Sequence, residues 1–386
     1  MALAFLAWAP TWAQSGAPSG PGKPRLLIPP TKISQTVLSH TQVGEKPYLS
    51  FPCLLRLNEQ EILITFKRGT SHGTDRQADS DVIRFNTVTD QVLEHKTIGS
   101  LPDQKYQLTL PVRLPSGAIA FFADLQHQGH DNRHYRDGML YATSPDQGKT
   151  VGTWKKLPLV DGVEYGYPLD ALVEGNTVYL LAMSFGYRPG GLWSVAVLRS
   201  DDGAKSWKRV QNITEALGGG PINESCFVRV GSDFLVVCRG YLGQETRLAR
   251  FDQHFKLKQV VDLTGPQQLI GGYIGWPRIF YRDNRLYVMG RMWPGGASYQ
   301  VPPGQYPEQK NGRLGLLRIQ PESLAVEQLA LLDNEEGLTP IKDGYYAAPY
   351  WQKKGDEVWF NAVTYRAIGT HPPDIIRLAF RWDEVK

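Results

Sequence analysis

The sequence predicts an all-β protein folded as a six-bladed β-propeller. One observation is the composition: the 386 residues include 39 Gly, 27 Pro, 18 Tyr and 10 Trp, which suits short strands joined by tight turns. A second is a pair of apolar strands that recurs six times, and a third is that these copies fill the chain from about residue 48 onward. Four-stranded units repeated at such a period stack as blades around a central channel.

Each repeat begins with two apolar strands separated by a turn, and a third strand follows the pair. The intervals between successive repeats are 58, 59, 57, 51 and 72 residues. The repeats begin at Tyr48, Tyr106, Tyr165, Ile222, Tyr273 and Tyr345.

We expect the segment near Pro24–Pro29 to join the C-terminal strand Ile375–Trp382 in the last blade, because ring closure removes free sheet edges.

The N-terminal residues predict an exported protein. Residues 1–13 are apolar and end in Thr11-Trp12-Ala13, which is typical of a signal peptide, although a disordered apolar tail is the alternative. Residues 14–24 are a linker by composition, and residues 25–386 form the propeller domain. Beyond the first dozen residues no apolar run approaches the ~20 residues that a membrane span needs. We therefore expect a secreted or periplasmic protein.

Charge and cysteine content narrow the possible partners. The net charge is +4 and no Lys/Arg cluster stands out, so a nucleic-acid partner is not expected. The three cysteines include no CxxC pair, which argues against a zinc knuckle or a redox pair. Cys226 and Cys238 lie on paired strands and are predicted either to bridge or to be buried thiols. We expect a monomer without a cofactor.

Two similar turns follow the third strands of blades 2 and 3. They are Ser144–Thr150 (SPDQGKT) and Ser200–Trp207 (SDDGAKSW), with Ala204 where glycine is usual. In such a turn the Asp carboxylate accepts backbone N–H groups and the glycine supplies a positive φ. Both turns resemble the Asp-box of sialidase-like propellers, and this resemblance implies that they lie on the face away from the active site.

The opposite face is predicted to carry the site, because the starts of the inner strands and the loops after the second strands surround the channel mouth. Aromatic rings stack on sugar rings, and arginine pairs with a sugar carboxylate through two parallel hydrogen bonds. Residues of these types gather there, among them Arg291. As substrate-binding residues we predict Arg68, His72, His127, His130, Tyr165, Tyr167, Arg278 and Trp276.

Four segments resemble the sialidase superfamily specifically. INESCFVRVGSDFLVVCRG resembles the segment that carries a catalytic Glu and an Arg, which fall on Glu224 and Arg239. NGRLGLLRI resembles the segment of another carboxylate-binding Arg, which falls on Arg313. DGYYAAPYW resembles the segment of the nucleophilic Tyr, which aligns best on Tyr346, with Tyr345 one register away.

The fourth segment is in blade 1 and departs from the family pattern. SFPCLLRL and EILITFKRGTSHGTD are similar to the stretch that ends at the catalytic Asp, which falls on Asp75. Ser50 stands where that family has the first Arg of its carboxylate clamp. Either Lys67 or Arg68 replaces that Arg, or the enzyme takes a different acidic sugar.

The resemblance implies an exo-glycosidase that releases terminal acidic sugars, such as sialic acids, with retention of configuration. A neutral Tyr346 activated by Glu224 would attack the anomeric carbon, where the substrate carboxylate would repel an anionic nucleophile. Asp75 would protonate the leaving oxygen and then activate water. Arg239 and Arg313 would hold the substrate carboxylate.

Other functions remain open at this stage. A mouth His and a Tyr would suit β-elimination from a uronic acid, as in propeller polysaccharide lyases, and uronide hydrolases on propellers also use a mouth His. A non-catalytic glycan-binding propeller is a further alternative, because the first clamp Arg is missing. His127, His130 and His134 are close enough in sequence to suggest a metal, but no spacing to acidic residues is distinctive, so we predict none.

Overall fold

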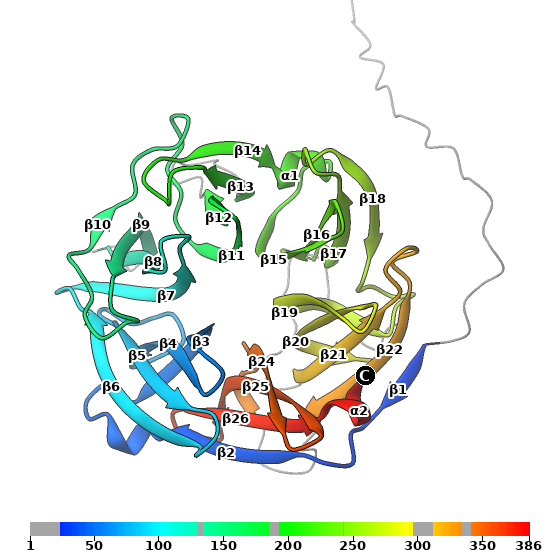
Figure 1. Ribbon diagram of the computed structural model, residues 1–386, viewed down its shortest axis with the longest axis horizontal. Coiled ribbons are helices and arrows are strands. Elements are labelled where there is room, and N and C mark those ends of the chain that lie inside the picture. Colours follow the sequence, from blue (N-terminus) through cyan, green and yellow to red (C-terminus); the bar gives the residue numbers. More distant parts are fainter. Residues whose placement is uncertain (1–23, 130–133, 185–192, 242, 296–311, 334–340) are drawn as a thin grey trace, which may run out of the picture.

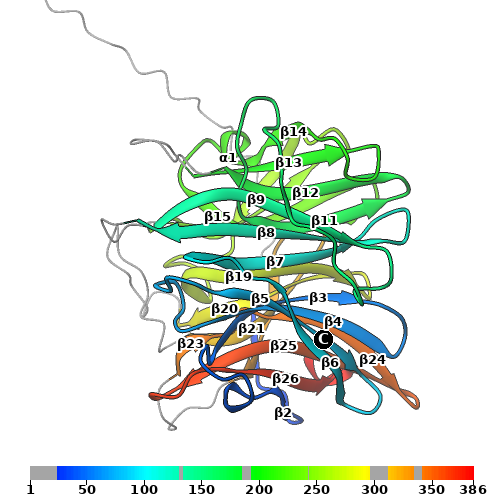
Figure 2. The same cartoon turned by 90° about the vertical axis from the view of Figure 1, so that its left-hand side faces the viewer.

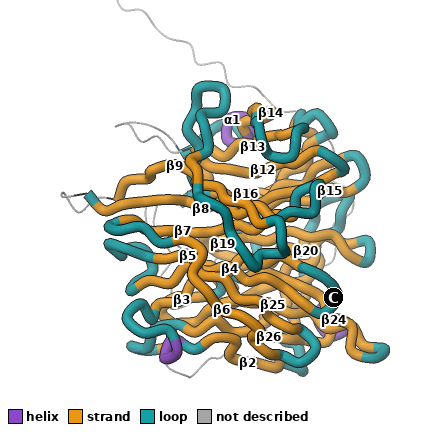
Figure 3. Tube along the Cα trace, turned by 60° about the vertical axis from the view of Figure 1, so that its left-hand side comes forward, coloured by secondary structure: helices purple, strands orange, loops and turns teal. Residues whose placement is uncertain are grey.

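The computed structural model describes residues 24–129, 134–184, 193–241, 243–295, 312–333 and 341–386. Six sheets of mainly antiparallel strands surround a central channel as the blades of a propeller, which confirms the predicted fold class (Figure 1). Seen from the side, the strands run across the thickness of the ring from one face to the other (Figure 2). Strand dominates the fold, and the described helices are single short turns at the periphery (Figure 3).

Blades 1 to 3 follow one another along the chain, and each runs from an inner to an outer strand. Blade 1 consists of β3 (Tyr48–Arg56), β4 (Glu61–Gly69), β5 (Asp79–Asn86) and β6 (Gln91–Gly99). Blade 2 consists of β7 (Gln104–Arg113), β8 (Ile119–Gln128), β9 (His134–Ser144) and β10 (Lys155–Lys156). Blade 3 consists of β11 (Pro168–Glu174), β12 (Thr177–Ser184), β13 (Ser194–Ser200) and β14 (Lys208–Asn212).

Blades 4 to 6 repeat this order. Blade 4 consists of β15 (Ile222–Val230), β16 (Asp233–Gly240), β17 (Arg247–Phe251) and β18 (Leu257–Asp262). Blade 5 consists of β19 (Ile270–Arg282), β20 (Arg285–Pro294), β21 (Arg313–Ile319) and β22 (Val326–Asp333), with β1 (Arg25–Leu27) added outside. Blade 6 consists of β23 (Ile341–Gly344), β24 (Ala348–Lys354), β25 (Glu357–Ile368) and β26 (Asp374–Arg381), with β2 (Ile33–Leu38) as its outer strand.

The ring is closed by a different N-terminal segment from the one predicted. The segment near Pro24–Pro29 contains β1, which pairs in parallel with β22 of blade 5. It is β2 that pairs with β26 and completes blade 6 (Figure 1). The prediction that Pro24–Pro29 lies in the last blade was therefore wrong. β2 contains two buried residues, Val37 and Leu38, whereas β1 contains none, so burial favours β2 as the strand that completes the blade.

Every inner strand is interrupted near its start, and the interruptions position the channel side chains. The register of β3, β7, β11, β15 and β19 shifts there, and in blade 6 the chain leaves the sheet between β23 and β24. Such bulges bend a strand and re-aim a side chain. The residues out of register include Phe51, Gln107, Leu169, Glu224, Trp276 and Tyr346. Glu224 and Tyr346 therefore both lie at the interruption of an inner strand.

The two turns singled out in blades 2 and 3 have the expected internal hydrogen bonds. The Asp146 carboxylate accepts the Thr150 N–H at 2.8 Å, and the Asp202 carboxylate accepts the Ser206 N–H at 3.0 Å. Ala204 adopts φ 70°, in the left-handed region that glycine tolerates best. Because these turns follow third strands, they lie on the face opposite the starts of the inner strands.

Apolar residues fill the spaces between the blades. One large cluster includes Phe66, Phe122 and Leu180 from blades 1 to 3, and a second joins blades 4 and 5 around Val237 and Val288.

All three cysteines are buried free thiols, so Cys226 and Cys238 are not bridged. In the described part of the chain no helix is long and apolar enough to cross a membrane. The proposed signal peptide (1–13) and nearly all of the linker (14–24) lie outside the described residues.

Candidate active site

Tyr346 lies at the centre of a buried polar cluster. Its hydroxyl donates to Glu224 Oε1 at 2.7 Å and accepts from Arg239 Nη1 at 3.1 Å. Arg239 Nη1 also pairs with Glu224 Oε2 at 2.6 Å, and the Trp276 backbone N–H donates to that oxygen at 2.7 Å. The structure thus brings together three residues that the sequence selected, from blades 4 and 6.

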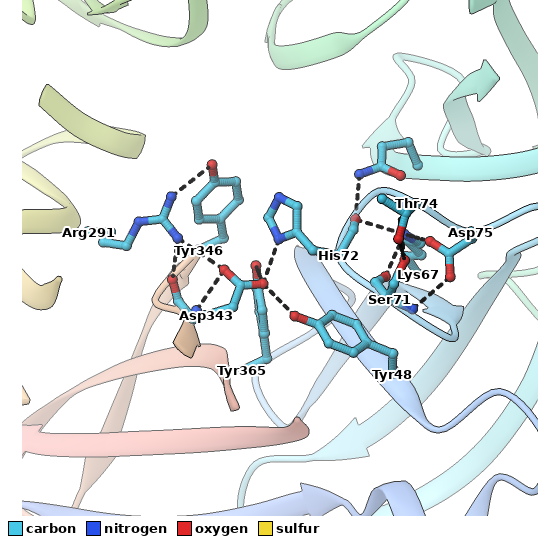
Figure 4. Close-up of polar contacts among 12 residues, drawn as sticks. Tyr48, Lys67, Ser71, His72, Thr74, Asp75, Arg291, Asp343, Tyr346 and Tyr365 are labelled. Carbon is cyan, nitrogen blue, oxygen red and sulfur yellow. Dashed lines mark hydrogen bonds and ion pairs between the residues drawn. The ribbon is translucent and has the colours of Figure 1, made fainter. Parts of the chain in front are cut away.

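A second guanidinium group, that of Arg291, reaches the same hydroxyl. Arg291 lies near the end of β20, and its Nη2 donates to the Tyr346 hydroxyl at 3.4 Å (Figure 4). Its Nη1 pairs with Asp343 Oδ1 at 3.1 Å, and its Cζ lies 4.8 Å from the centre of the Tyr346 ring. Two arginines therefore flank the phenol oxygen.

Burial and charge keep Tyr346 neutral and Glu224 ionised. Burial and the nearby Glu224 charge raise the pKa of Tyr346 well above its ordinary value. Burial alone would raise the pKa of Glu224, but Arg239 and the hydrogen bonds from Tyr346 and Trp276 outweigh it and lower that pKa. The phenol consequently keeps its proton, and a carboxylate able to accept that proton lies beside it.

Asp75 has a different environment from the one expected of an acid catalyst. Its Oδ2 forms a buried ion pair with Lys67, and its Oδ1 accepts the backbone N–H groups of Thr70 at 2.5 Å and Ser71 at 2.8 Å. Burial opposes ionisation, but Lys67 and these N–H groups lower the pKa of Asp75. The carboxylate holds together the loop between β4 and β5 (Figure 4).

His72, on that same loop, faces the cluster around Tyr346. Its Nδ1 lies 2.5 Å from Asp343 Oδ2. Its ring is 6.3 Å from the Tyr346 ring and packs edge-on against Phe51 at 4.9 Å. Asp343 is buried and also accepts from Tyr48 at 2.6 Å, so it links blade 1 to blade 6.

Three other predicted residues line the channel near Tyr346. The Trp276 ring is nearly parallel to the Tyr346 ring, at an interplanar angle of 6° and a centroid distance of 5.8 Å. Tyr167 packs edge-on against Trp276 at 6.1 Å. Arg278 lies over Trp276 at 4.1 Å and donates to the Leu169 carbonyl at 3.0 Å. These rings form one wall beside the phenol.

The remaining predicted residues have their described contacts elsewhere. Arg68 pairs with Asp79 at 2.8 Å and Asp81 at 2.7 Å within blade 1. His127 pairs with Asp137 at 2.8 Å in blade 2.

Tyr165 is buried just before the first strand of blade 3, and burial raises its pKa despite the nearby Arg209. Arg313 begins β21 opposite Met292 in the register, whereas Leu314 is opposite Arg291. Residues paired across two strands point to the same side of a sheet, and neighbours along a strand point to opposite sides. Arg313 and Arg291 therefore emerge on opposite faces of blade 5.

His130 and the side chain of His134 lie outside the described residues. Within the described part of the chain no three His, Cys, Asp or Glu side chains are grouped to hold a metal ion.

The sequence analysis placed Arg291 at the channel mouth but gave it no role, and it missed Asp343. Arg239 and Arg291 both lie near the end of a second strand, where Lys67 lies in blade 1. Comparing these equivalent positions would have selected Arg291. No local pattern marks Asp343, because its partners come from blades 1, 5 and 6.

The fold is a six-bladed propeller of the kind found in sialidases. No protein-family model matches the chain, and no curated protein matches its sequence. Among solved structures, a protein of unknown function from Dyadobacter fermentans has a TM-score of 0.69 at 14% identity, over 91% of this chain and 99% of that one.

Two sialidase structures share the same fold. A phage phi92 endosialidase has a TM-score of 0.63 at 10% identity, over 91% of this chain and 69% of that one. The NanB sialidase from Streptococcus pneumoniae has a TM-score of 0.58 at 11% identity, over 91% and 71% of the two chains. Similarity at this level shows a common fold.

Proposed function

We propose that the chain is a glycoside hydrolase that releases terminal acidic sugars, such as sialic acids, through a covalent link to Tyr346. The observation that carries this proposal is the environment of the Tyr346 hydroxyl, which contacts Glu224, Arg239 and Arg291. A neutral phenol can approach an anomeric carbon that bears a carboxylate, and Glu224 accepts the phenol proton as the bond forms. The two guanidinium groups stabilise the developing negative charge on the oxygen and attract an acidic sugar.

The sialidase fold of the structural neighbours supports the class of reaction. Export through the proposed signal peptide would bring the enzyme to extracellular glycans. The buried rings of Trp276 and Tyr167 would hold the Tyr346 ring in place for attack on the sugar.

The test is a substrate screen with two neighbouring tyrosine variants. The protein is assayed on fluorogenic sialosides and on uronic-acid polysaccharides. Tyr346→Phe should lower turnover by about 10³-fold or more, because the variant lacks the atom that bonds to the sugar.

Tyr345→Phe is the matched control, because the Tyr345 hydroxyl donates to Asp333 at 2.7 Å and not to the site. Its turnover should stay close to that of the unmodified protein. A fully active Tyr346→Phe enzyme would contradict the proposal. Binding of acidic sugars without any release would instead favour a glycan-binding propeller.

One observation favours a second candidate, β-elimination from a uronic acid. The pair formed by His72 and Asp343 lies beside Tyr346, so a base and an acid are present in one site. A lyase forms an unsaturated uronate that absorbs in the ultraviolet, whereas a hydrolase releases reducing sugar without that absorbance. The products of the same screen separate the two reactions.

A further inference from the structure

A retaining hydrolase with Tyr346 as nucleophile needs a second group, which gives a proton to the leaving oxygen and later removes one from water. Asp75 is unsuited to the role of acid and base catalyst. Both of its oxygens are occupied by Lys67 and by N–H groups of its own loop, and its side chain has no exposed surface. An acid catalyst must hold a proton and reach the substrate, and an ion-paired, enclosed carboxylate does neither.

His72 is placed where it can reach a substrate. It is on the loop that Asp75 holds together, and 38% of its side-chain surface is exposed. Two hydrogen bonds fix its backbone carbonyl, from Lys67 Nζ at 2.9 Å and Gln107 Nε2 at 3.1 Å. Phe51 packs edge-on against the ring, at a centroid distance of 4.9 Å. The imidazole is therefore both held in place and open to the channel.

Asp343 determines which ring nitrogen faces the channel. Its carboxylate is 2.5 Å from His72 Nδ1, and Nε2 consequently points away from Asp343 toward the open side (Figure 4). Tyr48, Tyr365 and Arg291 also donate to Asp343, at 2.6, 3.2 and 3.1 Å. Burial would raise the pKa of Asp343, but His72 and Arg291 outweigh it, so the carboxylate stays ionised. An ionised carboxylate at Nδ1 orients an imidazole and stabilises its protonated form.

We propose that His72 is the acid and base catalyst of this site and that Asp343 is its positioning residue. This inference rests on the proposed hydrolase function and assigns to His72 the role that the family resemblance gave to Asp75. In the first step His72 Nε2–H protonates the leaving oxygen as its bond to the anomeric carbon breaks, while Tyr346 bonds to that carbon and passes its proton to Glu224. In the second step water attacks the same carbon, His72 takes a proton from the water, and the departing Tyr346 oxygen recovers its proton from Glu224.

The experiment compares two leaving groups on the full-length protein. An aryl sialoside has a good leaving group that needs little protonation, whereas an alkyl sialoside needs an acid. His72→Gln should lower kcat/KM on the alkyl substrate by about 10²- to 10³-fold and on the aryl substrate by less than about tenfold. His95→Gln is the matched control, because His95 is also held by a buried aspartate, Asp81 at 2.8 Å, on the outer strand of blade 1. It should leave both rates unchanged.

Asp75→Asn distinguishes the two assignments. If Asp75 only holds the loop, this variant should lower the melting temperature and reduce both rates by similar factors. A leaving-group effect in Asp75→Asn and none in His72→Gln would overturn the proposal, as would equal losses on both substrates in His72→Gln. Failure of the wild-type protein to hydrolyse even the aryl sialoside would instead contradict the proposed function.

The protonation state of the His72 ring nitrogens, measured without substrate, tests the role of Asp343. Nitrogen-15 NMR should find neutral His72 protonated at Nδ1, because that atom faces the carboxylate. Asp343→Asn should shift the population toward the Nε2 tautomer and reproduce the leaving-group effect of His72→Gln. A neutral His72 protonated mainly at Nε2 in the unmodified protein would contradict the proposed orientation.

Discussion

At the scale of single residues, the question is which arginines would bind the carboxylate of an acidic sugar. Resemblance assigned this role to Arg239 and Arg313, but in the structure it is Arg291 that contacts the Tyr346 hydroxyl together with Arg239. With Ser50 in blade 1 at the position of the family's first Arg, we expect Arg239 and Arg291 to provide most of the binding of an acidic sugar.

Arg291→Lys should therefore weaken the use of acidic sugars selectively. A lysine keeps the charge but cannot make two parallel hydrogen bonds, so kcat/KM for a free acid should fall by about 10²-fold. The methyl ester of the same sugar should lose much less. Arg313→Lys provides the comparison, measured on the same pair of substrates. Equal losses on acid and ester in Arg291→Lys would mean that this arginine only supports the structure.

At the scale of single elements, the turns and inner strands follow from local sequence. Serine, aspartate and small residues at fixed spacing specify the turns of blades 2 and 3, and the structure has them between third and fourth strands. The interruptions of the inner strands were not predicted. Phe51, Trp276 and Tyr345 have φ values of 57°, 48° and 65°, which no propensity of these residue types favours. The packing of whole blades holds them there, as is common near functional sites.

Ala204→Gly should stabilise the protein. Ala204 occupies a left-handed conformation at the position where Gly148 stands in blade 2. Relief of its Cβ strain should exceed the entropic cost of glycine and raise the free energy of unfolding by about 0.5–1 kcal/mol in denaturant titration. Gly148→Ala should have the opposite effect, since an added Cβ would lie 2.8 Å from Leu63 Cδ1. Destabilisation by Ala204→Gly would show that the turn does not strain this residue.

At the scale of the molecule, the number of blades was predictable but the long-range contacts were not. A period near 58 residues is visible along the chain, so blade number and order followed from it. Asp343, by contrast, contacts residues 52 and 271 positions away, Arg291 and His72. Such contacts arise only when the ring closes, and for the same reason the sequence could not decide which N-terminal strand completes blade 6.

Truncation of the N-terminus tests how the ring is closed. A variant that starts at Thr31 lacks only β1, so its melting temperature should fall by a few degrees relative to a variant that starts at Pro24, at roughly 2–4 °C per kcal/mol lost. A variant that starts at His40 also lacks β2 and leaves β26 as an open edge. Its melting temperature should fall by roughly 10 °C or more, or unfolding should lose cooperativity. Equal melting temperatures for the variants starting at Thr31 and His40 would mean that β2 does not close the ring.

The most direct test of the central role of Tyr346 is to trap the covalent intermediate. The full-length protein is incubated with 2,3-difluorosialic acid, in which fluoride leaves the anomeric carbon and the second fluorine slows the release of the sugar. Peptide mass spectrometry should then find one sugar adduct on the Tyr346 hydroxyl, which Tyr345→Phe keeps and Tyr346→Phe abolishes. An adduct on another residue, or sialoside hydrolysis that persists in Tyr346→Phe, would contradict the account.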